Sequence, residues 1–120
     1  MVKKLFLDIY GVISHNEKAT ILHHRKLALK GRLLSERIIW KVPPTIQYPS
    51  GFKYRLIVVN PITQEVILLY DNHWPKRPHI HGSKGERDYD FINVEKLRND
   101  FILESVVEVK RYHENKKNSN

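Results

Sequence analysis

The segment at residues 52–71, FKYRLIVVNPITQEVILLYD, decides the fold of this chain. Two runs rich in branched and aromatic residues, 52–59 and 66–70, flank the dipeptide Asn60-Pro61, which is typical of a turn. This pattern predicts a β-hairpin. Both runs are apolar on both faces near the turn, which favours a central position in the sheet over an edge.

The register of this hairpin determines which side chains share a face of the sheet. If Val59 pairs with Val66, Arg55 lies opposite Tyr70. A shift of one residue would reverse the grouping, because side chains alternate along a strand. In the unshifted register Lys53, Arg55, Tyr70 and Asn72 share one face, and Tyr54 and Asp71 share the other.

Further strands are predicted before the hairpin. Residues 19–30 and 33–42 flank Gly31, whose permissive backbone suits a turn, so two antiparallel strands are the simplest interpretation. A helix over 19–30 is the alternative. Residues 3–14 also have the composition of a strand. The prolines and the glycine between residues 43 and 51 interrupt any strand and predict a connection.

A C-terminal helix is predicted to begin near Val94, with Asn93 as its N-cap. Leu97 and Phe101 begin an apolar stripe at helical spacing that should pack on the sheet. Residues 113–120 lack apolar anchors and are expected to form a flexible polar tail. The predicted fold is therefore α+β, with a mainly antiparallel β-sheet, a C-terminal helix packed on one face, and a single domain over residues 1–112.

The composition limits the classes of protein to which the chain can belong. Its 120 residues suit one domain, and 41% hydrophobic and 28% charged residues are typical of globular proteins. No apolar run is long enough to span a bilayer and no secretory signal is evident, so a cytoplasmic protein is expected. The net charge of +8 would attract RNA, DNA or an acidic protein partner. The absence of cysteine excludes disulfides, thiolate nucleophiles and the commonest zinc sites.

The segment YDNHWPKRPHIH, at residues 70–81, is the first candidate for a functional site. An apolar strand leads here into a basic and aromatic loop that ends in a His-x-His motif. Loops of this kind usually carry the binding or catalytic side chains of a scaffold.

An ordered set of short motifs resembles the TumE family of toxins from toxin-antitoxin systems. The motifs extend over roughly residues 18–102 and comprise Ile39-Trp40-Lys41-Val42-Pro43, Gly51-Phe52-Lys53-Tyr54-Arg55-Leu56, Tyr70-Asp71-Asn72, His79-x-His81, Tyr89-Asp90-Phe91 and Val94-Glu95-x-Leu97 with Asp100-Phe101. The resemblance implies a toxin of a type II system that a cognate antitoxin protein neutralises.

Toxins of this size commonly act on RNA, and the basic charge fits that target. Metal-independent RNA cleavage needs an acid, a base and cations that stabilise the phosphorane, and histidine, tyrosine and arginine suit these tasks. The predicted catalytic residues are Arg55, Tyr70, His73, His79 and His81, and the predicted RNA-binding residues are Lys53, Trp74, Lys76 and Arg77. Tyr54, Asp71 and Asn72 are assigned a structural or orienting role.

Two alternatives to an endoribonuclease stay open. The chain can be a non-enzymatic module that binds nucleic acid or an acidic protein. It can also bind a metal through His79 and His81, which point to the same side of an extended segment, with Asp71 or His73 completing the site. No cofactor is predicted, and a homodimer is a further alternative.

Overall fold

The computed structural model describes residues 19–118, which form a six-stranded antiparallel sheet and one long helix. The strands are β1 (Thr20–Leu29), β2 (Leu33–Lys41), β3 (Phe52–Val59), β4 (Val66–Asp71), β5 (His79–Gly82) and β6 (Gly85–Asp88). They lie side by side in chain order, so each is hydrogen-bonded to its sequence neighbours. The short helix η1 (Lys30–Arg32) joins β1 to β2, and α2 (Val94–Asn118) follows the sheet.

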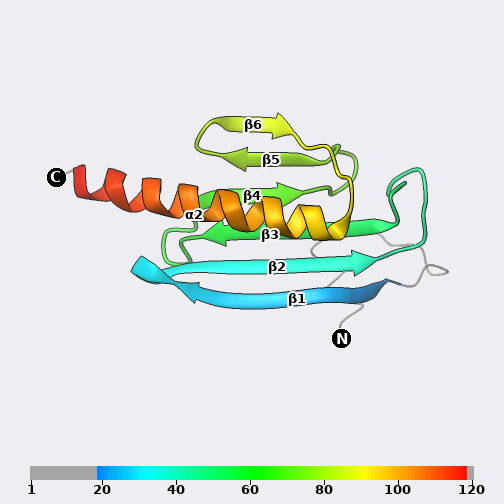
Figure 1. Cartoon of the computed structure of the whole chain (residues 1–120), viewed down its shortest axis with the longest axis horizontal. Helices are drawn as coiled ribbons and strands as arrows, with labels where there is room; N and C mark the ends of the chain where they lie inside the picture. The colour runs from blue at the N-terminus through cyan, green and yellow to red at the C-terminus, as the bar shows by residue number, and fades with distance from the viewer. Residues whose placement is uncertain (1–18, 119–120) are drawn as a thin grey trace.

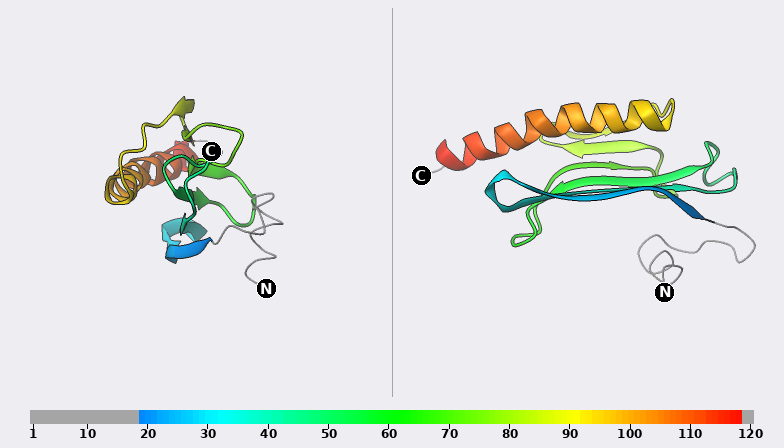
Figure 2. Two further views of the ribbon diagram at one scale, coloured as in Figure 1. Left: turned by 90° about the vertical axis from the view of Figure 1, so that its right-hand side faces the viewer. Right: turned by 60° about the horizontal axis from the view of Figure 1, so that its bottom comes forward.

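The fold is the predicted α+β arrangement, with α2 against one face of the sheet (Figures 1 and 2). The hairpin of β3 and β4 is confirmed and is central in the sheet. The strand predicted over residues 3–14 lies outside the described residues. The helix considered for residues 19–30 is wrong, because β1 occupies most of this segment and pairs with β2 along its whole length.

The turn between β1 and β2 requires glycine for two reasons. Gly31 has a φ of +74°, in the left-handed region that favours glycine. A Cβ atom at this position would also overlap the His113 ring of α2. His113 Nε2 donates a hydrogen bond to the Lys30 carbonyl at 3.0 Å, which joins the far part of the helix to this turn. Residues 113–118 belong to α2. The flexibility predicted for residues 113–120 stays a prediction.

The core lies between α2 and the middle of the sheet. Leu56 and Val58 of β3 and Leu97 and Phe101 of α2 are all 0% exposed. Their burial follows from the alternation of apolar residues in the strands and from the helical spacing of the stripe on α2. Burial of such side chains contributes most of the favourable free energy of folding.

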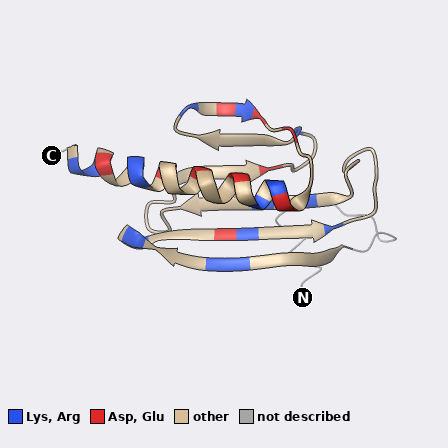
Figure 3. Cartoon of the chain, in the orientation of Figure 1, with Lys and Arg blue, Asp and Glu red and all other residues tan. Residues whose placement is uncertain are grey.

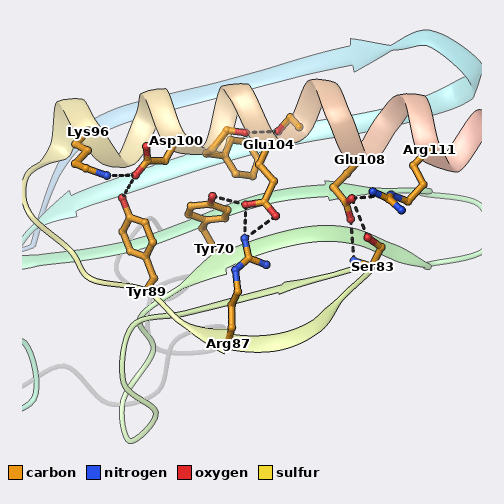
Figure 4. A network of polar contacts seen from close by, with 11 residues as sticks. Tyr70, Ser83, Arg87, Tyr89, Lys96, Asp100, Glu104, Glu108 and Arg111 are labelled. Atoms are coloured by element: carbon orange, nitrogen blue, oxygen red, sulfur yellow. Dashed lines mark hydrogen bonds and ion pairs between the residues drawn. The ribbon is translucent and has the colours of Figure 1, made fainter.

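Three carboxylates spaced four residues apart connect α2 to the strands beside it (Figure 4). Glu104 accepts hydrogen bonds from the Tyr70 phenol at 2.6 Å and from Arg87 Nη2 at 2.7 Å. Asp100 accepts from Tyr89 and Lys96, and Glu108 accepts from the backbone and hydroxyl of Ser83 and pairs with Arg111. The acidic side of the helix is thus directed towards β4, β5 and β6.

Candidate functional site

The register of β3 and β4 differs from the prediction because of a bulge. Val59 pairs with Val66 as expected, but the next pair is Val58 with Leu68, which leaves Ile67 as an extra residue in β4. Arg55 is consequently opposite Asp71, and Leu56 is opposite Tyr70. The predicted grouping of Arg55 with Tyr70 is therefore wrong, and Asp71 lies with Arg55 instead.

Tyr70 belongs to the face that α2 covers. It is 2% exposed, and its phenol donates to Glu104 on the helix. Burial, followed by the hydrogen bond to the Glu104 carboxylate, raises the pKa of Tyr70 well above its usual value. The phenol thus stays protonated as a donor within the core and does not face the loop residues with which the sequence groups it.

The other face, opposite α2, brings several of the predicted site residues together. Arg55, Asp71 and His79 are successive register partners on β3, β4 and β5, so they form a row across the sheet. Adjacent strands are separated by about 4.8 Å, which places His79 roughly 10 Å from Arg55 along this row. His81 lies on the same face two residues after His79 on β5, and Lys53 lies on it two residues before Arg55 on β3.

Lys53 is buried beneath this face and is not at the surface. It is 1% exposed, and its ammonium lies 5.3 Å from the centre of the Tyr48 ring. Burial lowers the pKa of Lys53 to about 8, and the nearby Asp71 carboxylate opposes that shift. Lys53, predicted as an RNA-binding residue, therefore lies below the surface that RNA would contact.

The titration of Lys53 should make stability depend on pH. Between about pH 8 and 10.5 the unfolded state binds more protons at this amine than the folded state, so stability should rise with pH in this window. The quantity to compare is the free energy of unfolding of the natural chain minus that of Lys53→Met. We expect this difference to increase between about pH 7.5 and pH 9.5. Denaturant titrations at the two pH values measure it, and a constant or falling difference would contradict the assignment.

His73 and Asp71 lie next to this buried amine. The Asp71 carboxylate accepts a hydrogen bond from the His73 backbone at 2.7 Å, which fixes the start of the loop after β4. Burial and then the positive charge of Lys53 lower the pKa of His73, while Asp71 acts in the opposite direction and Arg55 adds a smaller lowering. The His73 imidazole is therefore kept neutral at physiological pH.

His79 has a defined tautomer when neutral. A carbonyl oxygen can only accept, so the contact of 2.9 Å between His79 Nδ1 and the Arg77 carbonyl requires a proton on Nδ1. Nε2 then carries the lone pair, and it lies 3.7 Å from the Glu86 carboxylate, which also pairs with Lys76 at 2.7 Å. The ring can thus accept a proton at Nε2 and hold it beside a carboxylate.

Two hollows meet beside His79. The larger has a volume of about 550 Å³ and lies between the loop at Tyr48, the loop at Trp74 and the segment after β6. The smaller, of about 310 Å³, is lined by His79 and Glu86. Lys76, Arg77 and Asp88 line both hollows. Trp74 is 48% exposed at the larger hollow, where a planar ring is available for stacking.

The loop before β3 contributes a residue that the sequence interpretation missed. Tyr48 is 9% exposed, and its phenolic oxygen accepts a hydrogen bond of 3.3 Å from the Trp74 backbone. It therefore joins the loop before β3 to the loop after β4. Glu86, also missed, is placed by the pairing of β5 with β6. Tyr48 is distant from the 70–81 segment in sequence. Glu86 follows that segment by five residues and is brought to it by the turn between β5 and β6.

Asn72 and Tyr54, for which a structural or orienting role is predicted, make contacts inside the fold. Asn72 Oδ1 accepts from the Tyr54 backbone at 2.9 Å, and Nδ2 donates to the Phe52 carbonyl at 2.8 Å. These two bonds extend the β3–β4 ladder past the end of β4. The Tyr54 ring stacks on Phe91 at 5.7 Å and is 1% exposed.

The residues of the alternative metal site do not converge. Within residues 19–118 no group of three or more histidine, aspartate or glutamate side chains is placed to hold a metal ion. His79 Nε2 is directed to Glu86, and Asp71 is engaged by the His73 backbone. The set of His79, His81, Asp71 and His73 is therefore not arranged as that alternative requires.

Fold and site together define a small basic α+β protein with a cluster of imidazole, guanidinium and carboxylate groups on one face of its sheet. The family model described as Toxin TumE matches residues 5–112. The chain therefore belongs to the TumE toxin family, as its sequence motifs indicated. No curated protein and no solved structure matches it. Membership implies a toxin of a toxin-antitoxin system with an antitoxin partner. Within residues 19–118, no helix is long and apolar enough to cross a membrane.

Proposed function

We propose that this toxin acts on RNA in the cytoplasm as a small metal-independent endoribonuclease of a type II system. The observation that carries the proposal is the row of Arg55, Asp71 and His79 across three strands. His79, at one end of this row, lines the hollow at Glu86, which shares a wall with the hollow at Trp74. An imidazole and a guanidinium on one face of the sheet can serve as an acid or base and as the cation that phosphodiester cleavage needs. Trp74 can hold a base by stacking.

The proposed reaction uses the ribose 2′-hydroxyl as the nucleophile. A base takes the hydroxyl proton while the 2′-oxygen attacks the phosphorus, and the bond from phosphorus to the 5′-oxygen breaks. An acid supplies a proton to that leaving oxygen, which yields a 2′,3′-cyclic phosphate and a free 5′-hydroxyl. His79, through Nε2, would serve as one of these two groups, and His81 or His73 as the other. Arg55 would stabilise the negative charge of the phosphorane.

RNA would be held by the walls of the larger hollow. Trp74 offers a face for a base, and the wall that this hollow shares with the His79 pocket is formed by two cations, Lys76 and Arg77, and one carboxylate, Asp88. A phosphate at this shared wall would lie next to His79. The net charge of +8 would strengthen the encounter at low salt.

RNA cleavage by the purified chain is expected to persist in the presence of a chelator. It should also depend on pH through imidazole protonation, because no step of the proposed reaction uses a metal ion. The measurement is cleavage of total RNA with and without EDTA, with end-group analysis for the cyclic phosphate. Loss of cleavage in EDTA would contradict the metal-independent mechanism.

A second candidate is a module that binds RNA without cutting it. The burial of Lys53 and His79, which are 1% and 9% exposed, favours it, because groups this deep can serve to rigidify a binding surface. This candidate predicts salt-sensitive RNA binding with no cleavage under any condition of pH or metal. The same preparation decides between the two candidates.

A further inference from the structure

A third hollow lies on the face of the sheet that α2 covers, opposite the face that holds Arg55 and His79. It has a volume of about 580 Å³ and is found where the helix-side face of β1 and β2 extends past α2. Leu29, Ile102, Val106 and Val109 form its apolar walls, and Ser35 and Arg37 lie at its sheet side. We call this hollow the α2–β2 groove.

The helix wall of the groove exposes large apolar side chains. Ile102 is 37% exposed and Val106 is 67% exposed, and their spacing of four residues places them on one face of α2. Exposed apolar side chains that adjoin one another in a hollow are typical of interaction surfaces. The turn-to-turn spacing suits the side chains of a second helix or an extended segment.

The sheet side of the groove contains polar atoms that lack partners. Ser35 is 2% exposed, and among the described residues neither its hydroxyl nor Arg37 Nε has a hydrogen-bond partner. A buried polar group without a partner is unfavourable, and a ligand that supplies the partner removes that cost. Both groups can donate, so a carboxylate that enters the groove would satisfy them together.

The surroundings of the groove are strongly basic. Arg25 and Arg98 lie close enough to Arg37 and His23 for their charges to lower the pKa of both groups, after burial as the first cause. Lys30, Lys110 and Lys117 add positive charge to the lining, and Glu114 is its one carboxylate among the described residues. Acidic residues recur along α2 (Figure 3). The carboxylates of Asp100, Glu104 and Glu108 do not line the groove and bind Tyr89, Tyr70 and Ser83 instead (Figure 4).

We propose that the α2–β2 groove is the docking surface for the antitoxin, and that it receives an acidic amphipathic segment. Apolar residues of that segment would pack on Ile102 and Val106, and a carboxylate would accept hydrogen bonds from Ser35 and Arg37. A second copy of this chain is the poorer occupant, because two such basic grooves would repel each other. The proposal rests on the type II system proposed above, in which the antitoxin is a protein, and is independent of the chemistry proposed for RNA.

The test uses the full chain and the antitoxin encoded beside it, with the dissociation constant measured by calorimetry. Val106→Glu should weaken binding by about a hundredfold, because it places a buried negative charge against the acidic segment. Leu103→Glu is the matched control: Leu103 is 69% exposed on α2 but does not line the groove, so binding should stay within about threefold of the natural chain. Arg37→Met, which keeps the length of the side chain, should weaken binding by about tenfold.

Each variant is also checked for folding by circular dichroism. His79→Ala should bind the antitoxin as the natural chain does, so failure of the RNA proposal would leave this result unchanged. Antitoxin binding by Val106→Glu that matches Leu103→Glu would overturn the proposal. So would a sedimentation result in which the natural chain is a dimer and Val106→Glu is a monomer with unchanged antitoxin affinity, since a second copy would then occupy the groove.

Discussion

His79→Ala is expected to lower the rate of RNA cleavage by about 10²–10⁴-fold, the usual contribution of a positioned acid or base. The reason is the geometry of the ring: Nδ1 is committed to the Arg77 carbonyl, and Nε2 faces Glu86 in the pocket beside Lys76 and Arg77. Growth inhibition by the expressed toxin should fall with the cleavage rate. Single-turnover cleavage of a fluorescent RNA measures the effect.

Two further variants separate a catalytic role of His79 from a structural one. The amide of Asn in His79→Asn can still donate to the Arg77 carbonyl but cannot accept and release a proton, so this variant should be folded and nearly inactive. His24→Ala is the control. His24 is on β1, on the same face of the sheet as His79, and it pairs with Glu36. Four strand spacings separate His24 from His79, which is roughly 19 Å. Full activity of His79→Asn would show that the ring only supports the loop.

The fold could be predicted where the signal is local. The turn at Asn60-Pro61 separates two apolar runs, and the stripe of Leu97 and Phe101 has helical spacing, so the hairpin and the helix follow from neighbouring residues. The end of α2 could not be predicted in this way. The contact of His113 with the Lys30 carbonyl joins residues 83 positions apart, and no local pattern marks it.

The site was predicted in part. His79 and His81 lie on the same side of β5, as predicted, because alternation along a strand is a local property. That Arg55 shares this face depends on the register of β3 and β4, which was predicted wrongly. Tyr70 was placed on the wrong face because one extra residue, Ile67, forms a bulge that the apolar pattern does not reveal. Tyr48 was missed because the contact that brings it to the site joins two loops 26 residues apart in sequence. Glu86 was missed because no strand was predicted over residues 85–88, where β6 pairs it with His81.

Phe101→Ala is expected to produce the largest loss of stability, about 3–5 kcal/mol in the free energy of unfolding. Phe101 is 0% exposed and contacts the Tyr70 ring edge-on, with centroids 5.4 Å apart. The Arg37 guanidinium lies 5.9 Å from the centre of the same ring. Truncation would remove buried apolar area and leave a cavity between α2 and the sheet.

Leu103→Ala provides the comparison for this prediction, because Leu103 is on the same helix but is 69% exposed, so its loss should change stability by about 0.5 kcal/mol or less. Urea titrations of both variants measure the difference. A loss below about 1 kcal/mol for Phe101→Ala would mean that α2 is not held by this core.

Because Phe101 contacts both Tyr70 and Arg37, its removal should also loosen the α2–β2 groove, and antitoxin affinity should fall. Arg55 and His79 lie on the other face, so folded Phe101→Ala protein should retain the chemistry proposed for that surface.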